Sequence, residues 1–102
     1  MNRLPAIRID QERLAELCRE YGVARLSLFG SVVRDDFGPH SDVDVLVELR
    51  PSARVGLLRL AGLQLALTGL IGRNVHLSTP GSLSRYFRKS VVDDAVPVYD
   101  AA

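Results

Sequence analysis

Two short segments decide the fold of this chain: residues 30–34, which are Gly-Ser-Val-Val-Arg, and residues 41–47, which are Ser-Asp-Val-Asp-Val-Leu-Val. The second segment begins with alternating polar and apolar side chains, which is typical of a strand with one buried face. Asp42 and Asp44 therefore share the other face. Carboxylates held side by side repel each other unless a cation lies between them. The pattern predicts a site for Mg²⁺ or Mn²⁺, because these ions accept carboxylate oxygen as a ligand.

The residues around the first segment predict a turn that approaches an anion. Residues 23–29 are expected to form a strand that ends in a tight turn at Gly30. A glycine allows the backbone to come close to a phosphate, and the short helix expected after it offers free N–H groups. The Ser31 hydroxyl adds a further donor. Arg34 is placed either to reach a phosphate or to pair with a nearby carboxylate.

The loop between the two segments has two further candidate residues. Ser41 is expected to hydrogen-bond the loop backbone and so to orient Asp42. His40 is either a ligand beside the carboxylate pair or an exposed loop residue, and the sequence favours the second reading.

The combined pattern resembles the nucleotidyltransferase family that includes DNA polymerase beta, over roughly residues 14–99. It is most similar to the minimal nucleotidyltransferases (MNT), which are often encoded beside a HEPN-domain protein as a toxin–antitoxin pair. The resemblance implies an α/β fold, with a small mixed β-sheet and flanking helices. It implies ATP as the substrate and Mg²⁺ or Mn²⁺ bound by Asp42 and Asp44. The nucleotide-binding positions that it implies are Gly30, Ser31, Arg34 and Ser41.

One position departs from the family pattern. The family usually places a third carboxylate on the next strand, which is expected here over residues 73–78, and the matching residue is His76. An imidazole could take the proton of the attacking hydroxyl, or it could bind a softer metal such as manganese or zinc. The substitution could also have abolished catalysis.

The resemblance implies that the chain is an antitoxin that transfers AMP from ATP to a hydroxyl, typically of a tyrosine, on a HEPN toxin. A second hypothesis is a catalytically weak or inactive module that neutralises the toxin by binding alone, and His76 favours it. A third is a free-standing transferase that acts on a small molecule. The absence of a second domain to hold such a substrate argues against the third.

Two helices are expected before the third strand. The first covers about residues 11–21, with Asp10 as its N-cap, Gly22 as its C-terminal stop and Cys18 in the core. The second covers about residues 53–70 and is apolar on more than one side, so we expect a second copy or a partner protein to cover it. Polar residues interrupt this helix, which argues against a membrane span.

The remaining segments complete the expected α/β domain. Thr79 and Pro80 are expected to open the last helix, as N-cap and first residue. A closing strand is expected over residues 95–99, and Pro97 indicates that this strand lies at a sheet edge.

Length, composition and charge limit the function classes. The chain has 102 residues, 47% apolar and 25% charged, which fits one globular domain over residues 1–102. The net charge of +1 gives no basis for direct nucleic-acid binding, and the short chain argues against a templated polymerase. A single cysteine and the lack of an apolar signal region predict a cytoplasmic protein.

Overall fold

The computed structural model describes residues 8–33, 38, 41–53, 55–86 and 88–101. Along the chain the elements are α1 (Gln11–Tyr21), β1 (Val23–Phe29), the 3₁₀ turn η1 (Gly30–Val33), β2 (Val43–Leu49), α2 (Leu57–Ile71), β3 (Val75–Ser78), the 3₁₀ turn η2 (Pro80–Ser82), α3 (Arg88–Asp94) and β4 (Val96–Asp100). The predicted first helix and first strand are confirmed.

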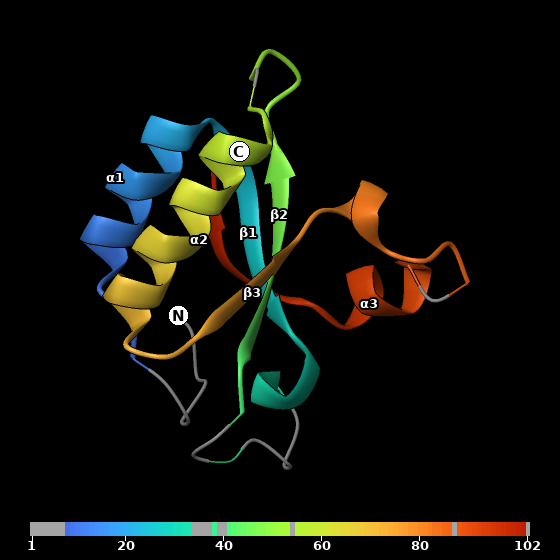
Figure 1. Ribbon diagram of the computed structural model, residues 1–102. Helices are drawn as coiled ribbons and strands as arrows, with labels where there is room; N and C mark the ends of the chain where they lie inside the picture. Colours follow the sequence, from blue (N-terminus) through green and yellow to red (C-terminus); the bar gives the residue numbers. More distant parts are fainter. Residues whose placement is uncertain (1–7, 34–37, 39–40, 54, 87, 102) are drawn as a thin grey trace.

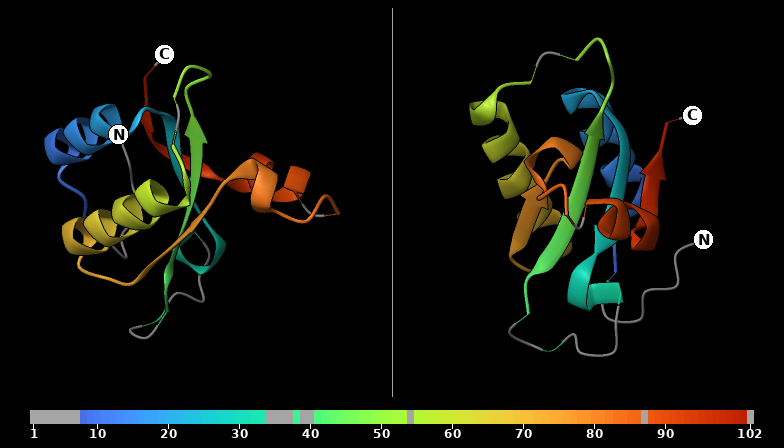
Figure 2. Two further views of the ribbon diagram at one scale, coloured as in Figure 1. Left: turned by 45° about the horizontal axis from the view of Figure 1, so that its top comes forward. Right: turned by 90° about the vertical axis from the view of Figure 1, so that its right-hand side faces the viewer.

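The strands form one mixed sheet in the order β3-β2-β1-β4. β1 pairs antiparallel with both β2 and β4, whereas β2 and β3 pair in parallel. Helices α1 and α2 lie side by side against one face, and η2 and α3 lie on the opposite side (Figures 1 and 2). The predicted α/β class with a small mixed sheet is therefore confirmed, and β4, with Pro97, lies at an edge as expected.

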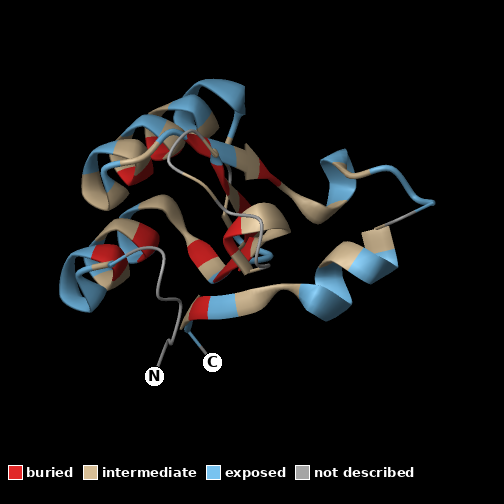
Figure 3. Ribbon diagram, turned by 90° about the horizontal axis from the view of Figure 1, so that it is seen from below, coloured by how far each residue is buried: buried red, intermediate tan, exposed pale blue. Residues whose placement is uncertain are grey.

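The hydrophobic core lies between the sheet and the two helices (Figure 3). Alternate residues of the paired strands face it, so that Leu28 lies opposite Val45 and Leu26 opposite Val47. The helices contribute Leu14, Cys18, Leu63 and Leu67, all fully buried. Because side chains alternate along a strand, Asp44 must lie on the face that points away from α1 and α2.

Local signals define both ends of α1. The Asp10 carboxylate accepts hydrogen bonds from the backbone N–H groups of Glu12 and Arg13, at 3.1 and 3.2 Å. Gly22 ends the helix with a φ of 72°, in the left-handed region that suits a residue without a Cβ. The predicted caps are confirmed.

Helix α2 protects the outer edge of β3. The side chains of Gln64 and Thr68 accept hydrogen bonds from the backbone N–H groups of Leu77 and Val75, at 3.1 and 3.2 Å. These donors belong to an edge strand and would otherwise be free to pair with another chain. These two polar residues of the largely apolar helix therefore hold β3 in place. In the part of the chain that the structure describes, no helix has the length and apolarity needed to cross a bilayer.

The prediction of one last helix from Thr79 onward is wrong. The Ser82 hydroxyl bonds both the N–H and the carbonyl of Thr79, at 3.0 and 2.9 Å, which closes a single 3₁₀ turn. Leu83 then adopts an extended backbone, and α3 begins only at Arg88. A serine that bonds the nearby backbone competes with helix propagation.

The other differences concern boundaries. The second helix begins at Leu57 instead of residue 53, because Gly56 adopts an extended N-cap conformation. The third strand begins at Val75 instead of residue 73, and the closing strand is shifted by one residue.

The buried thiol gives a first testable prediction. Burial raises the pKa of Cys18 from 9.0 to about 12, and the positive charge of Arg19 opposes this only in part. The pKa of this thiol is higher in the folded chain than in the unfolded chain. Its contribution to the free energy of unfolding is therefore fully present below pH 9 and is lost as the pH rises towards about 12. We expect Cys18 to resist thiol reagents in the native protein and to react quickly in urea, measured by absorbance of the released chromophore. Equal rates in both conditions would contradict this burial.

Candidate active site

Three segments that are distant in the sequence meet where β1 ends and β2 begins. The antiparallel register places Phe29 opposite Asp44, so the turn at Gly30 lies beside that carboxylate. The parallel register of β2 and β3 places His76 opposite Asp44 on the other side. The sequence predicts a site where the first two strands end. Because β1 and β2 run in opposite directions, the site lies instead at the end of β1 and the start of β2.

Gly30 is the tightest point of the site. Its φ is 73°, which a residue with a Cβ rarely adopts. A Cβ at this position would also overlap the Asp44 carboxylate and lie 3.1 Å from its Cγ. The absence of a side chain at position 30 is what allows the carboxylate to lie against the backbone of the turn.

Asp44 and His76 form a direct pair across β2 and β3. Their Oδ1 and Nδ1 atoms are 3.4 Å apart. The Asp44 side chain is 28% exposed, and that of His76 is 69% exposed. The pair is thus open to solvent and to a ligand, while the backbone of both residues is fixed by the strand register.

The loop before β2 is held by an arginine that the sequence analysis did not single out. The Arg73 guanidinium donates hydrogen bonds to the carbonyl groups of Gly38 and Ser41, at 2.6 and 2.9 Å. The Ser41 hydroxyl accepts a hydrogen bond from the Gly38 N–H at 3.0 Å, which confirms the expected loop contact. In the sequence, Arg73 is distinguished only by its position, between Gly72, which ends α2, and the start of β3.

The remaining predicted residues fall in different places. Asp42 is exposed and comes directly before β2, and Ser31 lies half-buried in η1. Arg34 and His40 lie outside the residues that the structure describes. The contacts that the structure shows therefore join the turn, Asp44 and His76, and Asp42 is near them in the sequence.

The donor set fits a metal that is shared with a nucleotide. Within the described residues, no three or more His, Cys, Asp and Glu side chains converge as a complete metal centre. Asp44 and His76 provide two neighbouring donors, and Asp42 is close in sequence. Mg²⁺ sites in phosphate-transfer enzymes use one or two carboxylates together with substrate phosphates, without an all-protein cage.

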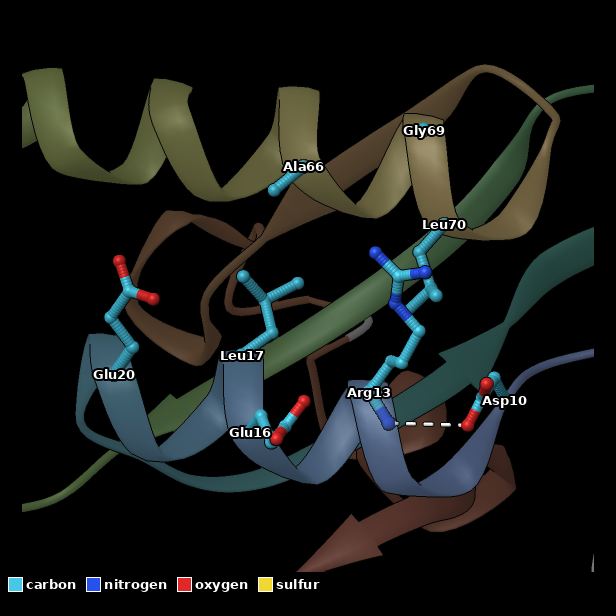
Figure 4. Close-up of a pocket in the computed structure, with 8 residues that line it drawn as sticks. All are labelled: Asp10, Arg13, Glu16, Leu17, Glu20, Ala66, Gly69 and Leu70. Carbon is cyan, nitrogen blue, oxygen red and sulfur yellow. Dashed lines mark hydrogen bonds between the residues drawn. The ribbon is translucent and has the colours of Figure 1, made fainter.

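A separate groove lies between α1 and α2 (Figure 4). Its lining residues are Asp10, Arg13, Glu16, Leu17, Glu20, Ala66, Gly69 and Leu70. None of the predicted site residues belongs to this groove, so the groove and the candidate site are distinct.

Replacement of Gly30 by alanine tests how the site is built. Gly72 is the matched control, because its φ is 80° and nothing lies within 4 Å of an added Cβ. A left-handed conformation costs an alanine about 1–2 kcal/mol, so both variants should lose free energy of unfolding. Gly30→Ala should lose clearly more in urea titrations, because the Asp44 carboxylate must also move.

The same experiment in an Asp44→Ala background removes the carboxylate and leaves only the Cβ of residue 44, 3.3 Å from the added Cβ. There the cost of Gly30→Ala should fall towards that of Gly72→Ala. Equal costs in both backgrounds would show that Asp44 does not press on the turn.

Comparison with known proteins identifies the family. The sequence profile described as "Nucleotidyltransferase domain" matches residues 11–98. Protein adenylyltransferase MntA from Thermococcus cleftensis is 36% identical over 85 residues, which cover 81% of this chain and 82% of the relative. A solved structure assigned as a minimal nucleotidyltransferase is 36% identical, has a TM-score of 0.71, and is matched over 85% of this chain and 87% of its own.

A more distant structure shares the fold. It is a tri-AMPylated Shewanella oneidensis HEPN toxin in complex with an MNT antitoxin, and it matches with a TM-score of 0.62 over 89% of this chain and 70% of its own. At 18% identity this likeness is one of fold alone. The family match spans α1, the Gly30 turn, both aspartates and His76, and this chain belongs to the nucleotidyltransferase domain family.

Proposed function

We propose that this chain is a metal-dependent protein adenylyltransferase that acts as an antitoxin in the cytoplasm. It transfers AMP from ATP to a tyrosine hydroxyl on a HEPN toxin. The observation that carries the proposal is the contact of the Gly30 turn with the Asp44 carboxylate, on the face of the sheet that points away from α1 and α2. The family match and the relative named as a protein adenylyltransferase support it.

Gly30 and polar residues that follow it up to Asp44 have these roles in the proposed reaction. The backbone of Gly30 and the hydroxyl of Ser31 hold the β- and γ-phosphates, with Arg34 and Ser41 as auxiliary positions. Asp42 and Asp44 would hold Mg²⁺ or Mn²⁺, which would supply positive charge beside the phosphates. Arg73 keeps the loop before Asp42 in place through Gly38 and Ser41.

The transfer needs no reactant besides ATP and the acceptor hydroxyl. The acceptor oxygen forms a bond to the α-phosphorus, the bond to the bridging oxygen breaks, and pyrophosphate leaves with the electron pair. The hydroxyl proton goes to solvent or, when the imidazole is not bound to the metal, to His76.

The outer face of α2 is the proposed contact surface for the toxin or for a second copy of this chain. Leu57, Leu58 and Leu65 are 87%, 89% and 72% exposed. Arg59 is the only charged residue among the 15 residues of α2. Large exposed apolar side chains grouped on one helix are typical of a protein–protein interface.

A second candidate function is neutralisation by binding alone. The observation in its favour is His76, which stands where the family usually has a carboxylate. In this case the chain would keep the fold and the α2 surface but transfer no nucleotide.

Intact-mass measurement separates the two functions. The chain is mixed with a HEPN-domain protein as the test partner, ATP and either Mg²⁺ or Mn²⁺. We expect the partner to gain the mass of one or more AMP groups. Asp42→Asn and Asp44→Asn should abolish the gain without loss of binding, because each removes a metal ligand. Asp93→Asn is the matched control, since Asp93 is exposed on α3 and forms an ion pair with Lys89 at 3.0 Å.

A binding arm completes the experiment. Leu58→Glu should weaken the complex by placing a charge on the proposed contact surface. Binding and inhibition of the toxin with no mass gain under either metal would contradict the transferase and establish the binding module.

A further inference from the structure

We propose that His76 is a metal ligand and that it changes the metal preference of the site, from Mg²⁺ towards divalent transition-metal ions such as Mn²⁺. The inference rests on the proposed function, because it concerns the ion that the nucleotide would bring to Asp44. The juxtaposition that carries it is Nδ1 of His76 beside Oδ1 of Asp44, across two paired strands.

The spacing of the two donors suits one shared ion. Two donors that bind an ion at about 2.1 Å and meet it near a right angle lie about 3 Å apart. The observed separation of Oδ1 and Nδ1 is 3.4 Å. Only a small side-chain rotation is needed for both atoms to become neighbouring ligands.

The surroundings fix one donor and leave the other adjustable. The Gly30 turn holds the Asp44 carboxylate from one side. The parallel register fixes the backbone of His76 opposite Asp44, whereas its side chain is 69% exposed and free to turn onto an ion. The backbone N–H of Leu77, next to His76, donates a hydrogen bond to the Gln64 side chain, and this contact keeps β3 in register.

The chemistry of the imidazole then determines which metal ion the site prefers. Mg²⁺ favours oxygen ligands and near-ideal octahedral geometry, so a nitrogen in place of a carboxylate oxygen weakens its binding. Imidazole is a good ligand for Zn²⁺, Fe²⁺ and Ni²⁺, and Mn²⁺, the first ion of the same transition-metal series, also accepts carboxylate oxygen. A neutral imidazole also supplies no negative charge, which further lowers the affinity for a hard cation.

Pulsed electron paramagnetic resonance of bound Mn²⁺ tests the ligand directly. The full chain is loaded with Mn²⁺ and a non-hydrolysable ATP analogue. We expect coupling to the ¹⁴N nucleus of an imidazole in the wild-type protein and its loss in His76→Asp. In parallel titrations, the Mg²⁺ concentration that displaces Mn²⁺ should be clearly higher for the wild type than for His76→Asp.

Asn74→Asp is the control for charge. Asn74 is exposed and lies two residues before His76, so the variant adds the same carboxylate but retains the imidazole. We expect it to keep the nitrogen coupling and the wild-type order of metals. The same metal ratio in wild type and His76→Asp, with no coupling, would overturn the inference.

The outcomes distinguish this inference from the proposed function. AMP transfer to the partner without nitrogen coupling would overturn the ligand role of His76 and leave the transferase in place. Nitrogen coupling without transfer under either metal would support the ligand role and overturn the transferase.

Discussion

The site depends on one steric constraint, which is the approach of the Asp44 carboxylate to the backbone of the turn at Gly30. No side chain fits between them, and the φ of 73° excludes most residues in any case. The antiparallel register of β1 and β2 produces this approach, because it places the last residue of β1 opposite Asp44. The turn that we propose binds phosphate and the carboxylate that we propose binds a metal are thereby brought together by backbone pairing alone.

Helix α2 serves both the core and the third side of the site. Its buried residues Leu63 and Leu67 pack against the sheet, while Gln64 and Thr68 accept the edge hydrogen bonds of β3. These contacts hold β3 in the register that places His76 opposite Asp44. This largely apolar helix thus has three faces, one for the core, one for the strand edge and one that remains exposed.

The sequence predicted those features that depend on local pattern. Alternation revealed β2, and the caps Asp10 and Gly22 bounded α1, because strand periodicity and capping involve residues that are near in the chain. The role of Arg73 could not be predicted, since it depends on a loop more than thirty residues away. The break after Ser82 was missed because a helix-opening Thr-Pro pair also opens a single 3₁₀ turn. The Asp44–His76 contact required the parallel register, which side-chain alternation alone does not specify.

Paramagnetic broadening in the amide spectrum of the full chain tests the central claim most directly. Mn²⁺ would be added in small steps together with a non-hydrolysable ATP analogue. The account predicts that the amide signals of Gly30, Ser31, Asp44 and His76 broaden first, since these residues surround the ion. Broadening centred instead on Glu16 and Glu20, in the groove between α1 and α2, would contradict the assignment of the site.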